Sequence, residues 1–250
     1  MASLDLTFRS QVLGQEQELK ILLPHPYLLQ AGSELAVLYL LHGYSDNQTA
    51  WARRTGVERY LEDSGKPLLI VMPNMQNYFY TDIVNGPRFF SYIAEELPRV
   101  LSAYFHPSQS REHTFVAGLS MGGYGAFKLA LRYPERFSRA ASFSGALAMV
   151  SHREHAEGRT TQLSDDLRFI FGDRVREEDD LIALLQRVAP EHLPALYQSC
   201  GTADALYEEN QVFLAAARQA KAPITYYEEA GIAHEWAFWD REIQKFIVGL

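Results

Sequence analysis

Cysteine is almost absent from the 250-residue sequence, because Cys200 is the only one. A lone cysteine excludes an internal disulfide and is typical of proteins from a reducing compartment. The sequence has no run of apolar residues long enough to span a membrane. Its first residues carry neither the basic nor the apolar segment of a secretory signal. We therefore predict a cytoplasmic protein that does not enter a membrane.

The sequence also has fewer basic than acidic residues. The sequence has 23 lysines and arginines against 31 aspartates and glutamates, so its formal net charge is −8. Proteins that bind nucleic acids usually present a basic surface, and we therefore expect no nucleic-acid partner. The composition, 47% hydrophobic and 22% charged, is that of an ordinary globular protein, and the length suits one or two domains.

Buried strands and amphipathic helices alternate along most of the sequence. Continuous apolar runs predict strands, and apolar residues at helical spacing predict helices. The expected strands lie near residues 35–41, 67–72, 114–119, 140–143, 195–200 and 224–228, and the expected helices near 54–63, 89–104, 121–132, 205–220 and 239–250. Alternating patterns within residues 4–23 add an antiparallel strand pair. This order predicts an α/β fold, with a mostly parallel sheet and helices on both faces.

The alternation is interrupted at residues 149–194. This segment is charged and has only short helical pieces, near 167–171 and 181–188, so it lacks a core of its own. We therefore predict a single domain of residues 1–250, in which the insertion lies over the carboxyl edge of the sheet and forms part of the roof of the site. His152 and His155 lie within it without a nearby cysteine, and we predict an exposed polar loop and no metal site.

The most informative segment joins the strand at 114–119 to the helix at 121–132. Residues 118–122 read Gly-Leu-Ser-Met-Gly, which is the G-x-S-x-G pattern of a nucleophile elbow. Ser120 then stands at a helix N-terminus, where free N–H groups favour developing negative charge. The same run resembles a dinucleotide-binding fingerprint, but a serine in place of the middle glycine would block a pyrophosphate. We therefore predict no cofactor.

A serine alone is a poor nucleophile, so a histidine base and an acid should follow it. In folds with this elbow the chain order is serine, acid, histidine, and each residue follows a strand. His234 lies just after the last predicted strand, and Asp204 lies just after the preceding one. Asp173 in the insertion and Asp240 on the last helix are poorer candidates for the acid. We predict a catalytic triad of Ser120, Asp204 and His234, in which Asp204 can also cap the following helix.

The carbonyl oxygen of an attacked substrate becomes negative and needs N–H donors. The backbone N–H of Met121, directly after the serine, should be one of them. The other should come from the loop after the strand at 35–41, with the N–H of Tyr44 as first choice and that of Gly43 as second. The aromatic residues Tyr80 and Trp236 fall on segments that should flank the site, and both are candidates for the substrate pocket.

Several motifs appear in the same order as in a known family. They are Leu40-Leu41-His42-Gly43-Tyr44, Trp51, Tyr80-Thr81-Asp82, Glu95-Glu96-Leu97-Pro98, Ala117 to Gly125, Ser142 to Ala146, Cys200-Gly201 with Asp204, and His234-Glu235-Trp236. With them the sequence resembles the esterase D/S-formylglutathione hydrolase group of α/β-hydrolases, and its closest likeness is to the tributyrin esterase branch. The resemblance implies an α/β-hydrolase fold and a serine carboxylesterase that acts on short acyl esters without a cofactor, often as a homo-oligomer. It supports the three triad residues position by position.

Two departures from the S-formylglutathione hydrolases favour the tributyrin esterase branch. Those enzymes carry histidine where this sequence has Tyr124, and a cysteine where it reads Ser45-Asp46. We therefore expect a small-molecule ester substrate, hydrolysed through an acyl-serine intermediate. The same intermediate would allow acyl transfer to a carbohydrate or thiol acceptor, and S-formylglutathione hydrolysis is a further alternative. A non-catalytic binding protein ranks last, because no member of the triad is missing.

Overall fold

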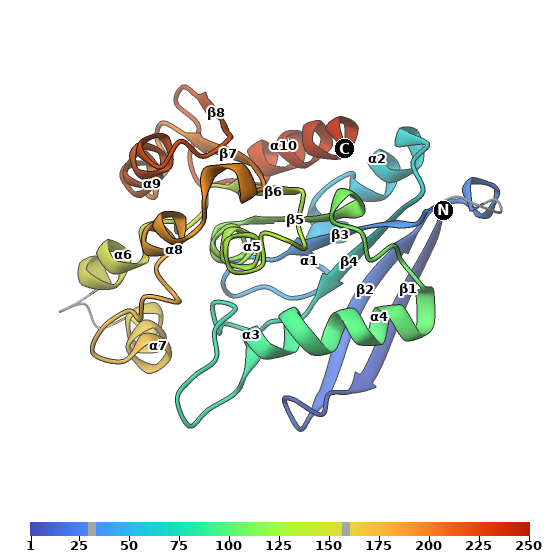
Figure 1. Cartoon of the computed structure of the whole chain (residues 1–250), viewed down its shortest axis with the longest axis horizontal. Helices are drawn as coiled ribbons and strands as arrows, with labels where there is room; N and C mark the ends of the chain where they lie inside the picture. Colours follow the sequence, from blue (N-terminus) through green and yellow to red (C-terminus); the bar gives the residue numbers. More distant parts are fainter. Residues whose placement is uncertain (30–33, 157–160) are drawn as a thin grey trace.

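The computed structural model of the protein describes residues 1–29, 34–156 and 161–250. Within these residues an eight-stranded sheet runs in the order β1-β2-β4-β3-β5-β6-β7-β8 (Figure 1). Its strands are β1 (Ala2–Arg9), β2 (Glu16–Leu23), β3 (Ala36–Leu41), β4 (Leu68–Pro73), β5 (Thr114–Leu119), β6 (Arg139–Phe143), β7 (Ala195–Gly201) and β8 (Ile224–Glu229). All strands predicted from residue 35 onward are present.

Helices occupy most connections between the strands. The α-helices are α1 (Ala50–Arg54), α2 (Val57–Ser64), α3 (Phe89–Ser91), α4 (Leu97–Phe105), α5 (Met121–Arg132), α6 (Met149–Ala156), α7 (Gln162–Phe171), α8 (Leu181–Arg187), α9 (Tyr207–Gln219) and α10 (Trp236–Gly249). A π-helical segment, η2 (Tyr92–Glu96), joins α3 to α4, and 3-10 turns form η1 (Pro26–Leu28), η3 (Arg111–His113) and η4 (Pro190–His192). In the described part of the chain, no helix is long and apolar enough to cross a membrane.

Strand pairing follows the side-chain pattern. β1 pairs antiparallel with β2, with Leu6 opposite Leu19, and β2 pairs antiparallel with β4. From β4 to β8, neighbouring strands are all parallel. The strands β3, β4 and β5 are buried at every residue, which explains their uninterrupted apolar runs. The predicted α/β fold with a mostly parallel sheet is confirmed.

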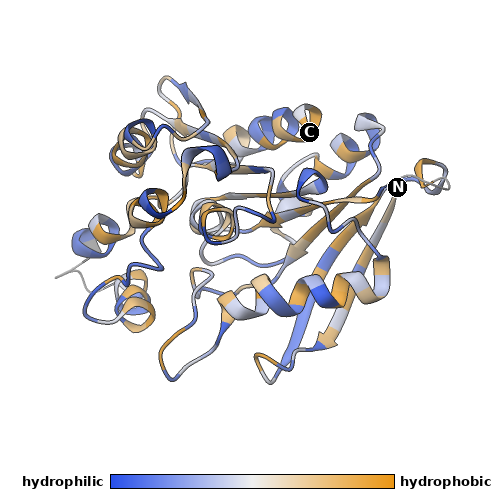
Figure 2. Ribbon diagram, viewed as in Figure 1, coloured by the Kyte–Doolittle hydropathy of each residue, from blue (hydrophilic) through white to orange (hydrophobic). Residues whose placement is uncertain are grey.

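Helices cover both faces of the sheet. On one face, a buried cluster includes Phe127 of α5, Leu184 of α8 and Phe213 of α9. On the other face, a second cluster includes Leu61 of α2 and Ile243 of α10. In Figure 2 the central strands are mostly orange, whereas the helices carry both orange and blue. Helices α2, α9 and α10 therefore turn an apolar side toward the sheet and a polar side toward solvent. α5 is buried at every residue except Arg132.

The insertion after β6 differs from its prediction in one element. The two predicted helical pieces lie in α7 and α8, whose buried Leu167 and Leu184 belong to the same cluster as α5. α6 stands where a loop was predicted. Its strongly apolar residues, Met149 and Val150, both lie at its start, so the sequence lacks a helical period there. The three helices lie together at the left of the sheet in Figure 1.

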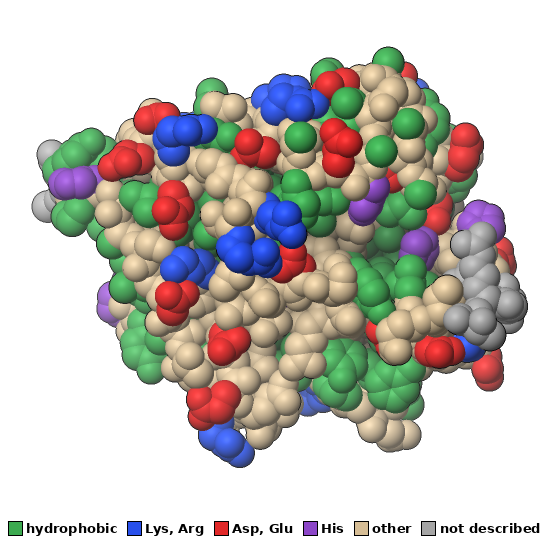
Figure 3. Space-filling model, turned by 180° about the vertical axis from the view of Figure 1, so that it is seen from behind, with side chains coloured by type: hydrophobic (Ala, Val, Ile, Leu, Met, Phe, Trp, Pro, Cys, Tyr) green, Lys and Arg blue, Asp and Glu red, His purple; other side chains and the backbone are tan. Residues whose placement is uncertain are grey.

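Charged side chains of both signs are interspersed over the surface. On the face shown in Figure 3, aspartates and glutamates lie among lysines and arginines, with small groups of hydrophobic side chains between them. The chain carries a formal net charge of −8. On this face, acidic side chains are therefore distributed over many positions.

The loops that carry the predicted site residues all leave the carboxyl edge of the sheet. β3 leads to residues 42–49, β5 to Ser120, β7 to residues 202–206 and β8 to residues 230–235. In the sheet, β3 is the neighbour of β5, and β7 is the neighbour of β8. Parallel strands thus bring these loops together at the edge where α/β folds bind ligands.

Candidate active site

Ser120 lies at the sharp turn between β5 and α5. Its φ of 52° and ψ of −119° are in a region that residues other than glycine seldom adopt. The turn is held by a hydrogen bond of 2.9 Å from the Ser120 N–H to the Phe143 carbonyl oxygen, and α5 begins at the next residue. The Ser120 side chain lines a cavity at the carboxyl edge of the sheet. This is the geometry of the predicted nucleophile elbow.

The two glycines of the elbow are required by the close approach of backbone atoms. A Cβ on Gly118 would collide with the carbonyl group of Gly122. A Cβ on Gly122 would collide with the carbonyl oxygen of Leu41, at the end of β3. The G-x-S-x-G spacing therefore reflects backbone packing on both sides of the serine.

Asp204 and His234 lie in direct contact. The Nδ1 of His234 is 2.9 Å from Oδ2 and 3.0 Å from Oδ1 of Asp204. Asp204 is buried, whereas the His234 side chain is one-third exposed. The Leu206 N–H also donates to Oδ1 of Asp204, at 2.8 Å, which orders the turn before α9. The predicted cap by Asp204 is wrong, because α9 begins at Tyr207 and no side chain caps it.

The surroundings of Asp204 favour its charged form. Burial alone would raise the pKa of its carboxyl group. Hydrogen bonds from His234, Leu206 and Ser144, together with the charge of His234, outweigh this and hold the pKa below its ordinary value. Asp240, one of the poorer candidates, accepts hydrogen bonds from the N–H of Gly56, just before α2, and from the hydroxyl of Tyr60 on α2.

The His234 ring is supported by residues that sequence reasoning did not identify. The Trp239 ring packs edge-on against it, with a centroid distance of 4.7 Å. The Nε1–H of Trp239 donates at 3.1 Å to Oγ of Ser144, which is fully buried. Trp239 lies on the first turn of α10. Its closeness to His234 in the sequence is the signal that could have identified it.

The predicted oxyanion donors flank the elbow. Tyr44 and Met121 line the same cavity as Ser120. In the described chain, neither of their backbone N–H groups has an acceptor. Gly43 does not line the cavity, but a Cβ on it would lie 3.5 Å from Ser120 Cβ and 2.6 Å from a methyl carbon of Leu119. The loop after β3 therefore passes directly against the elbow.

His42 holds this loop in place as a neutral imidazole. Its Nε2 accepts the Met75 N–H at 2.9 Å, so Nδ1 carries the hydrogen and donates to the Gly43 carbonyl oxygen at 2.7 Å. Burial lowers the pKa of His42 to about 4, against the opposing effect of the Gly43 carbonyl. His42 therefore orders the oxyanion loop and is uncharged near neutral pH.

The two predicted pocket residues do not line the cavity. Tyr80 is fully buried, and its hydroxyl donates at 2.9 Å to the carbonyl oxygen of His42. Trp236 packs edge-on between Trp51 and Trp239, at centroid distances of 5.5 and 5.3 Å. The structure therefore corrects the prediction for both residues: Tyr80 supports the loop after β3, and Trp236 supports the start of α10.

The cavity at Ser120 is small and mostly apolar. It has a volume of about 350 Å³. Its lining combines the predicted Tyr44, Ser120, Met121 and His234 with residues from the loops after β4, β6 and β7 and from the insertion, namely Phe79, Ala146, His152, Leu163, Ala205 and Leu206. The insertion thus contributes to the wall of the site.

His152 is a further polar residue in this lining, and the prediction for it is wrong. It lies on α6, and its side chain is only 14% exposed, where an exposed loop was expected. Its Nδ1 is 2.8 Å from Oε1 of Glu209, a buried residue of α9. The other carboxylate oxygen of Glu209 has no hydrogen-bond partner among the described residues. A histidine ordered by a carboxylate therefore faces the same cavity as Ser120.

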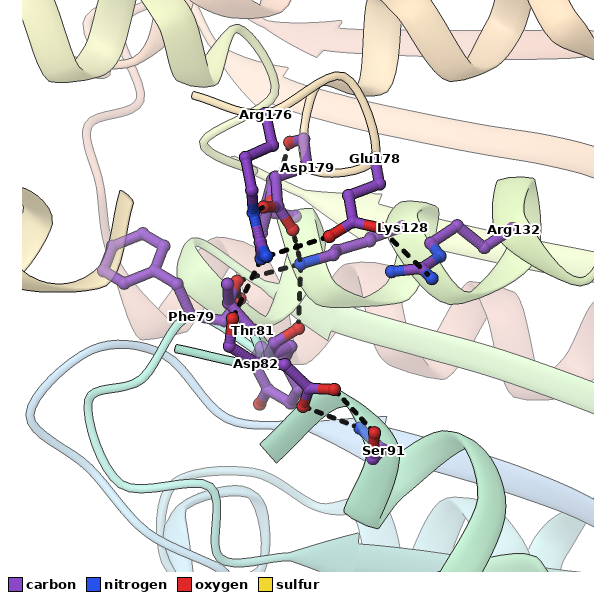
Figure 4. A network of polar contacts seen from close by, with 11 residues as sticks. Phe79, Thr81, Asp82, Ser91, Lys128, Arg132, Arg176, Glu178 and Asp179 are labelled. Carbon is purple, nitrogen blue, oxygen red and sulfur yellow. Dashed lines mark hydrogen bonds and ion pairs between the residues drawn. The ribbon is translucent and has the colours of Figure 1, made fainter. Parts of the chain in front are cut away.

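A buried cation joins the elbow helix to the insertion (Figure 4). Lys128 of α5 is fully buried, and its Nζ lies 2.5 Å from Oδ1 of Asp179. It also donates to Oγ1 of Thr81 and to the Tyr80 carbonyl oxygen, at 2.9 and 3.1 Å. Arg176 pairs with the second oxygen of Asp179 at 2.7 Å. Burial lowers the pKa of Lys128 to about 8, although Asp179 acts in the opposite direction.

The sheet, the serine elbow and the neighbouring aspartate–histidine pair define an α/β-hydrolase of the serine hydrolase class. The chain belongs to the family described as "Putative esterase", whose model matches residues 10–246. It is also similar to the acetyl esterase of Caldicellulosiruptor saccharolyticus, with 30% identity over 97% of this chain and 96% of that protein.

Solved structures give the same assignment. The chain is similar to FphF, a fluorophosphonate-binding serine hydrolase of Staphylococcus aureus, with 28% identity, a TM-score of 0.88, and coverage of 99% of this chain and 97% of that one. It is similar to S-formylglutathione hydrolase FrmB of Staphylococcus aureus, with 27% identity, a TM-score of 0.86, and coverage of 99% and 98%. The resemblance to the esterase D/S-formylglutathione hydrolase group is confirmed, and the chain is a carboxylesterase.

Proposed function

We propose that this carboxylesterase hydrolyses short-chain acyl esters with Ser120 as nucleophile, His234 as base and Asp204 as the acid that orients it. The observation that carries the proposal is the 2.9 Å contact between His234 and Asp204 at a cavity that Ser120 and His234 both line. Among the described residues no hydrogen bond joins Ser120 Oγ to the ring. Catalytic hydrogen bonds of this kind often tighten only when substrate is bound.

The reaction has two halves. The Ser120 oxygen attacks the ester carbonyl carbon while His234 takes the serine proton, and a tetrahedral intermediate forms. The carbon–oxygen bond to the alcohol then breaks, and His234 returns the proton to the leaving alcohol. A water molecule attacks the acyl-serine in the same way, so one ester and one water yield one carboxylic acid and one alcohol.

Two backbone groups stabilise the negative oxygen of each tetrahedral intermediate. We propose the N–H groups of Met121 and Tyr44, which border the cavity at Ser120 and have no acceptor in the described chain. Each such donor contributes about 3 kcal/mol to lowering the barrier. The N–H of Gly43 is the second choice for the loop donor.

The size of the cavity supports a preference for short acyl groups. A volume of about 350 Å³ is near the lower end of the range for small-molecule sites. The walls that limit the cavity include Phe79, Leu163 and Leu206. We expect kcat/KM for p-nitrophenyl esters to be highest for acetyl to butyryl groups, and at least tenfold lower for octanoyl. An undiminished rate with octanoyl would contradict this size limit.

Replacement of the nucleophile tests the proposed chemistry. Ser120→Ala should reduce p-nitrophenyl acetate hydrolysis by roughly 10⁴-fold or more, because the triad acts as a unit. Full activity in this variant would overturn the assignment.

Product analysis with thiol or carbohydrate acceptors separates hydrolysis from acyl transfer, because a transferase would yield the acylated acceptor. Assay with S-formylglutathione tests the remaining alternative directly.

A further inference from the structure

One polar side chain in the wall of the catalytic cavity takes no part in the proposed hydrolysis. The described residues that line this cavity are apolar apart from Tyr44, Ser120, His152 and His234. Ser120 and His234 carry the proposed chemistry, and the Tyr44 hydroxyl already donates to Asp166, at 2.6 Å. His152 therefore remains as the polar side chain of the wall that can contact a bound acyl group.

The contact with Glu209 sets the orientation of the His152 ring. The Nδ1 of His152 lies 2.8 Å from Oε1 of Glu209, and a carboxylate only accepts hydrogen bonds, so Nδ1 carries a hydrogen. Over residues 1–29, 34–156 and 161–250, Nε2 of the same ring has no hydrogen-bond partner. The ring also lies beside Phe79 of the cavity wall, at a centroid distance of 6.3 Å. Nε2 is thus the ring nitrogen that a ligand in the cavity can reach.

Packing between α6 and α9 does not by itself account for this pair. Glu209 is only 7% exposed, and its second carboxylate oxygen has no partner in the described part of the chain. A buried charged pair is often no more stable than two apolar side chains of similar volume. The buried carboxylate does, however, hold the His152 ring in one orientation at the cavity. The pair is therefore better explained by a role of His152 toward the substrate.

An unsubstituted alkyl chain would leave Nε2 of His152 without a partner. An acyl group that fills the cavity excludes water from this nitrogen, and a buried polar group without a hydrogen bond is destabilising. A site that is built to bind a hydroxyl therefore rejects the analogue that lacks it. A hydroxyl on the acyl chain can donate to Nε2 of the neutral ring or accept from Nε2–H of the charged ring, so it matches His152 in both forms.

We propose that His152 selects short acyl groups that carry a hydroxyl, and that Glu209 is the residue that positions it. The inference rests on the proposed ester hydrolysis and narrows its substrate class. One hydroxyacyl ester and one water yield one hydroxycarboxylic acid and one alcohol, and the hydroxyl of the acyl chain is left intact. The cavity of about 350 Å³ at Ser120 contains the acyl group, and the hydroxyl binds to Nε2 of His152.

Esters in which a hydroxyl replaces a methyl group test this selection. We compare ethyl 3-hydroxybutyrate with ethyl 3-methylbutyrate, and ethyl lactate with ethyl isobutyrate, by titrating the acid released. Each ratio of kcat/KM is divided by the ratio of the alkaline hydrolysis rates, which removes the difference in intrinsic reactivity. We expect wild type to prefer the hydroxyacyl ester at least tenfold in one pair or in both. A corrected preference below threefold in both pairs would overturn the inference.

Variants of the pair test which residues cause the preference. His152→Leu should lower the corrected ratio at least tenfold, and Glu209→Leu at least threefold because the ring is then free to turn. Glu209→Gln keeps an oxygen that accepts from Nδ1 and should retain the ratio. A merely structural role would change both esters of a pair alike, so an unchanged ratio in His152→Leu would overturn the inference. If His152→Leu does not fold, the wild-type ratios and the two Glu209 variants decide.

The control variant removes a histidine–carboxylate pair from another part of the molecule. The Nδ1 of His113 lies 2.7 Å from Oε2 of Glu34. His113 precedes β5, whereas Ser120 follows it, so the two residues lie at opposite ends of this strand. His113→Leu should therefore leave the corrected ratio unchanged. A fall in the ratio equal to that in His152→Leu would show that the preference does not depend on contact with the acyl group.

The same assays separate this inference from the proposed function. Hydrolysis of all four ethyl esters with no corrected preference, abolished by Ser120→Ala, would leave the ester hydrolysis standing and make selection by His152 wrong. Absence of hydrolysis of p-nitrophenyl acetate and of all four esters would contradict the proposed hydrolysis itself, and the inference with it.

Discussion

At the scale of single residues, the site depends on backbone atoms that leave no space for a side chain. Gly122 lies on the first turn of α5, against the carbonyl oxygens of Leu41 and His42. Those two carbonyl groups belong to the end of β3 and to the loop that carries the Tyr44 N–H. A change at Gly122 therefore acts on the elbow and on the oxyanion loop together.

Substitution of Gly122 by alanine should therefore reduce both stability and activity. The new Cβ would collide with main-chain atoms, which cannot rotate away as a side chain can, so we expect a loss of about 1–3 kcal/mol in the free energy of unfolding. We also expect at least a tenfold loss in kcat/KM, because Ser120 and the loop after β3 must shift apart. Urea unfolding and p-nitrophenyl acetate kinetics measure the two effects. Gly249→Ala is the matched control, since nothing lies within 4 Å of its Cβ position; an equal response of both variants would contradict the argument.

At the scale of elements, α5 is tied to the insertion through a buried charge. Lys128 contacts Asp179 from the loop before α8, and it also contacts Thr81 from the loop after β4. The Tyr124 hydroxyl adds a hydrogen bond of 2.8 Å to the Asp179 carbonyl oxygen. A buried charge that loses its partner carries a large desolvation penalty, so these segments depend on one another.

Lys128→Met should lower the free energy of unfolding by about 3 kcal/mol, because Asp179 would keep only Arg176 as a cationic partner. Arg168→Met removes an exposed ion pair with Asp165 in the same insertion and should cost less than about 1 kcal/mol. Urea unfolding of both variants measures the difference. Similar losses in the two variants would show that the buried cation does not hold the insertion against α5.

The sequence predicts an element when burial leaves a pattern in its own residues, and fails when the element depends on contacts that are distant in sequence. β3, β4 and β5 are predictable because burial on both faces dictates an uninterrupted apolar run. α6 is not, because its side chains follow no apolar period and its place depends on contacts such as His152 with Glu209, 57 residues away in sequence. Tyr80 is misassigned for a related reason: its neighbours along the chain do not reveal that its hydroxyl reaches the carbonyl of His42.

At the scale of the whole molecule, the site is predictable because topology and chain order agree. Ser120, Asp204 and His234 each follow a parallel strand, and parallel strands deliver their following loops to one edge. The residues that line the cavity are less predictable, since they come from segments that approach one another only after folding. Phe79, His152 and Leu163 reach it from the loop after β4 and from the insertion.

The activity should fall on the acid side of the pH profile. The pKa of Asp204 is held below its ordinary value, so its carboxylate stays ionised above pH 5. Its charge then stabilises the folded protein at neutral pH, and this contribution is lost only as the pH falls below about 4. Burial lowers the pKa of His42 to about 4, so the imidazole of His42 stays neutral above pH 5. The two histidines that line the cavity, His234 and His152, remain as the groups whose protonation can affect the rate.

We assign the loss of activity at low pH, the acid limb of the pH profile, to His234, because a protonated imidazole cannot accept the Ser120 proton. The kcat/KM for p-nitrophenyl acetate should therefore fall as the pH is lowered, by tenfold per pH unit once the base is protonated. His152→Leu should keep an acid limb of the same slope and midpoint, because His152 takes no proton from Ser120. Profiles from pH 5 to 8 for wild type and this variant measure the limb. A flat wild-type profile would exclude His234 as the base, and loss of the limb in His152→Leu would transfer the titration to His152.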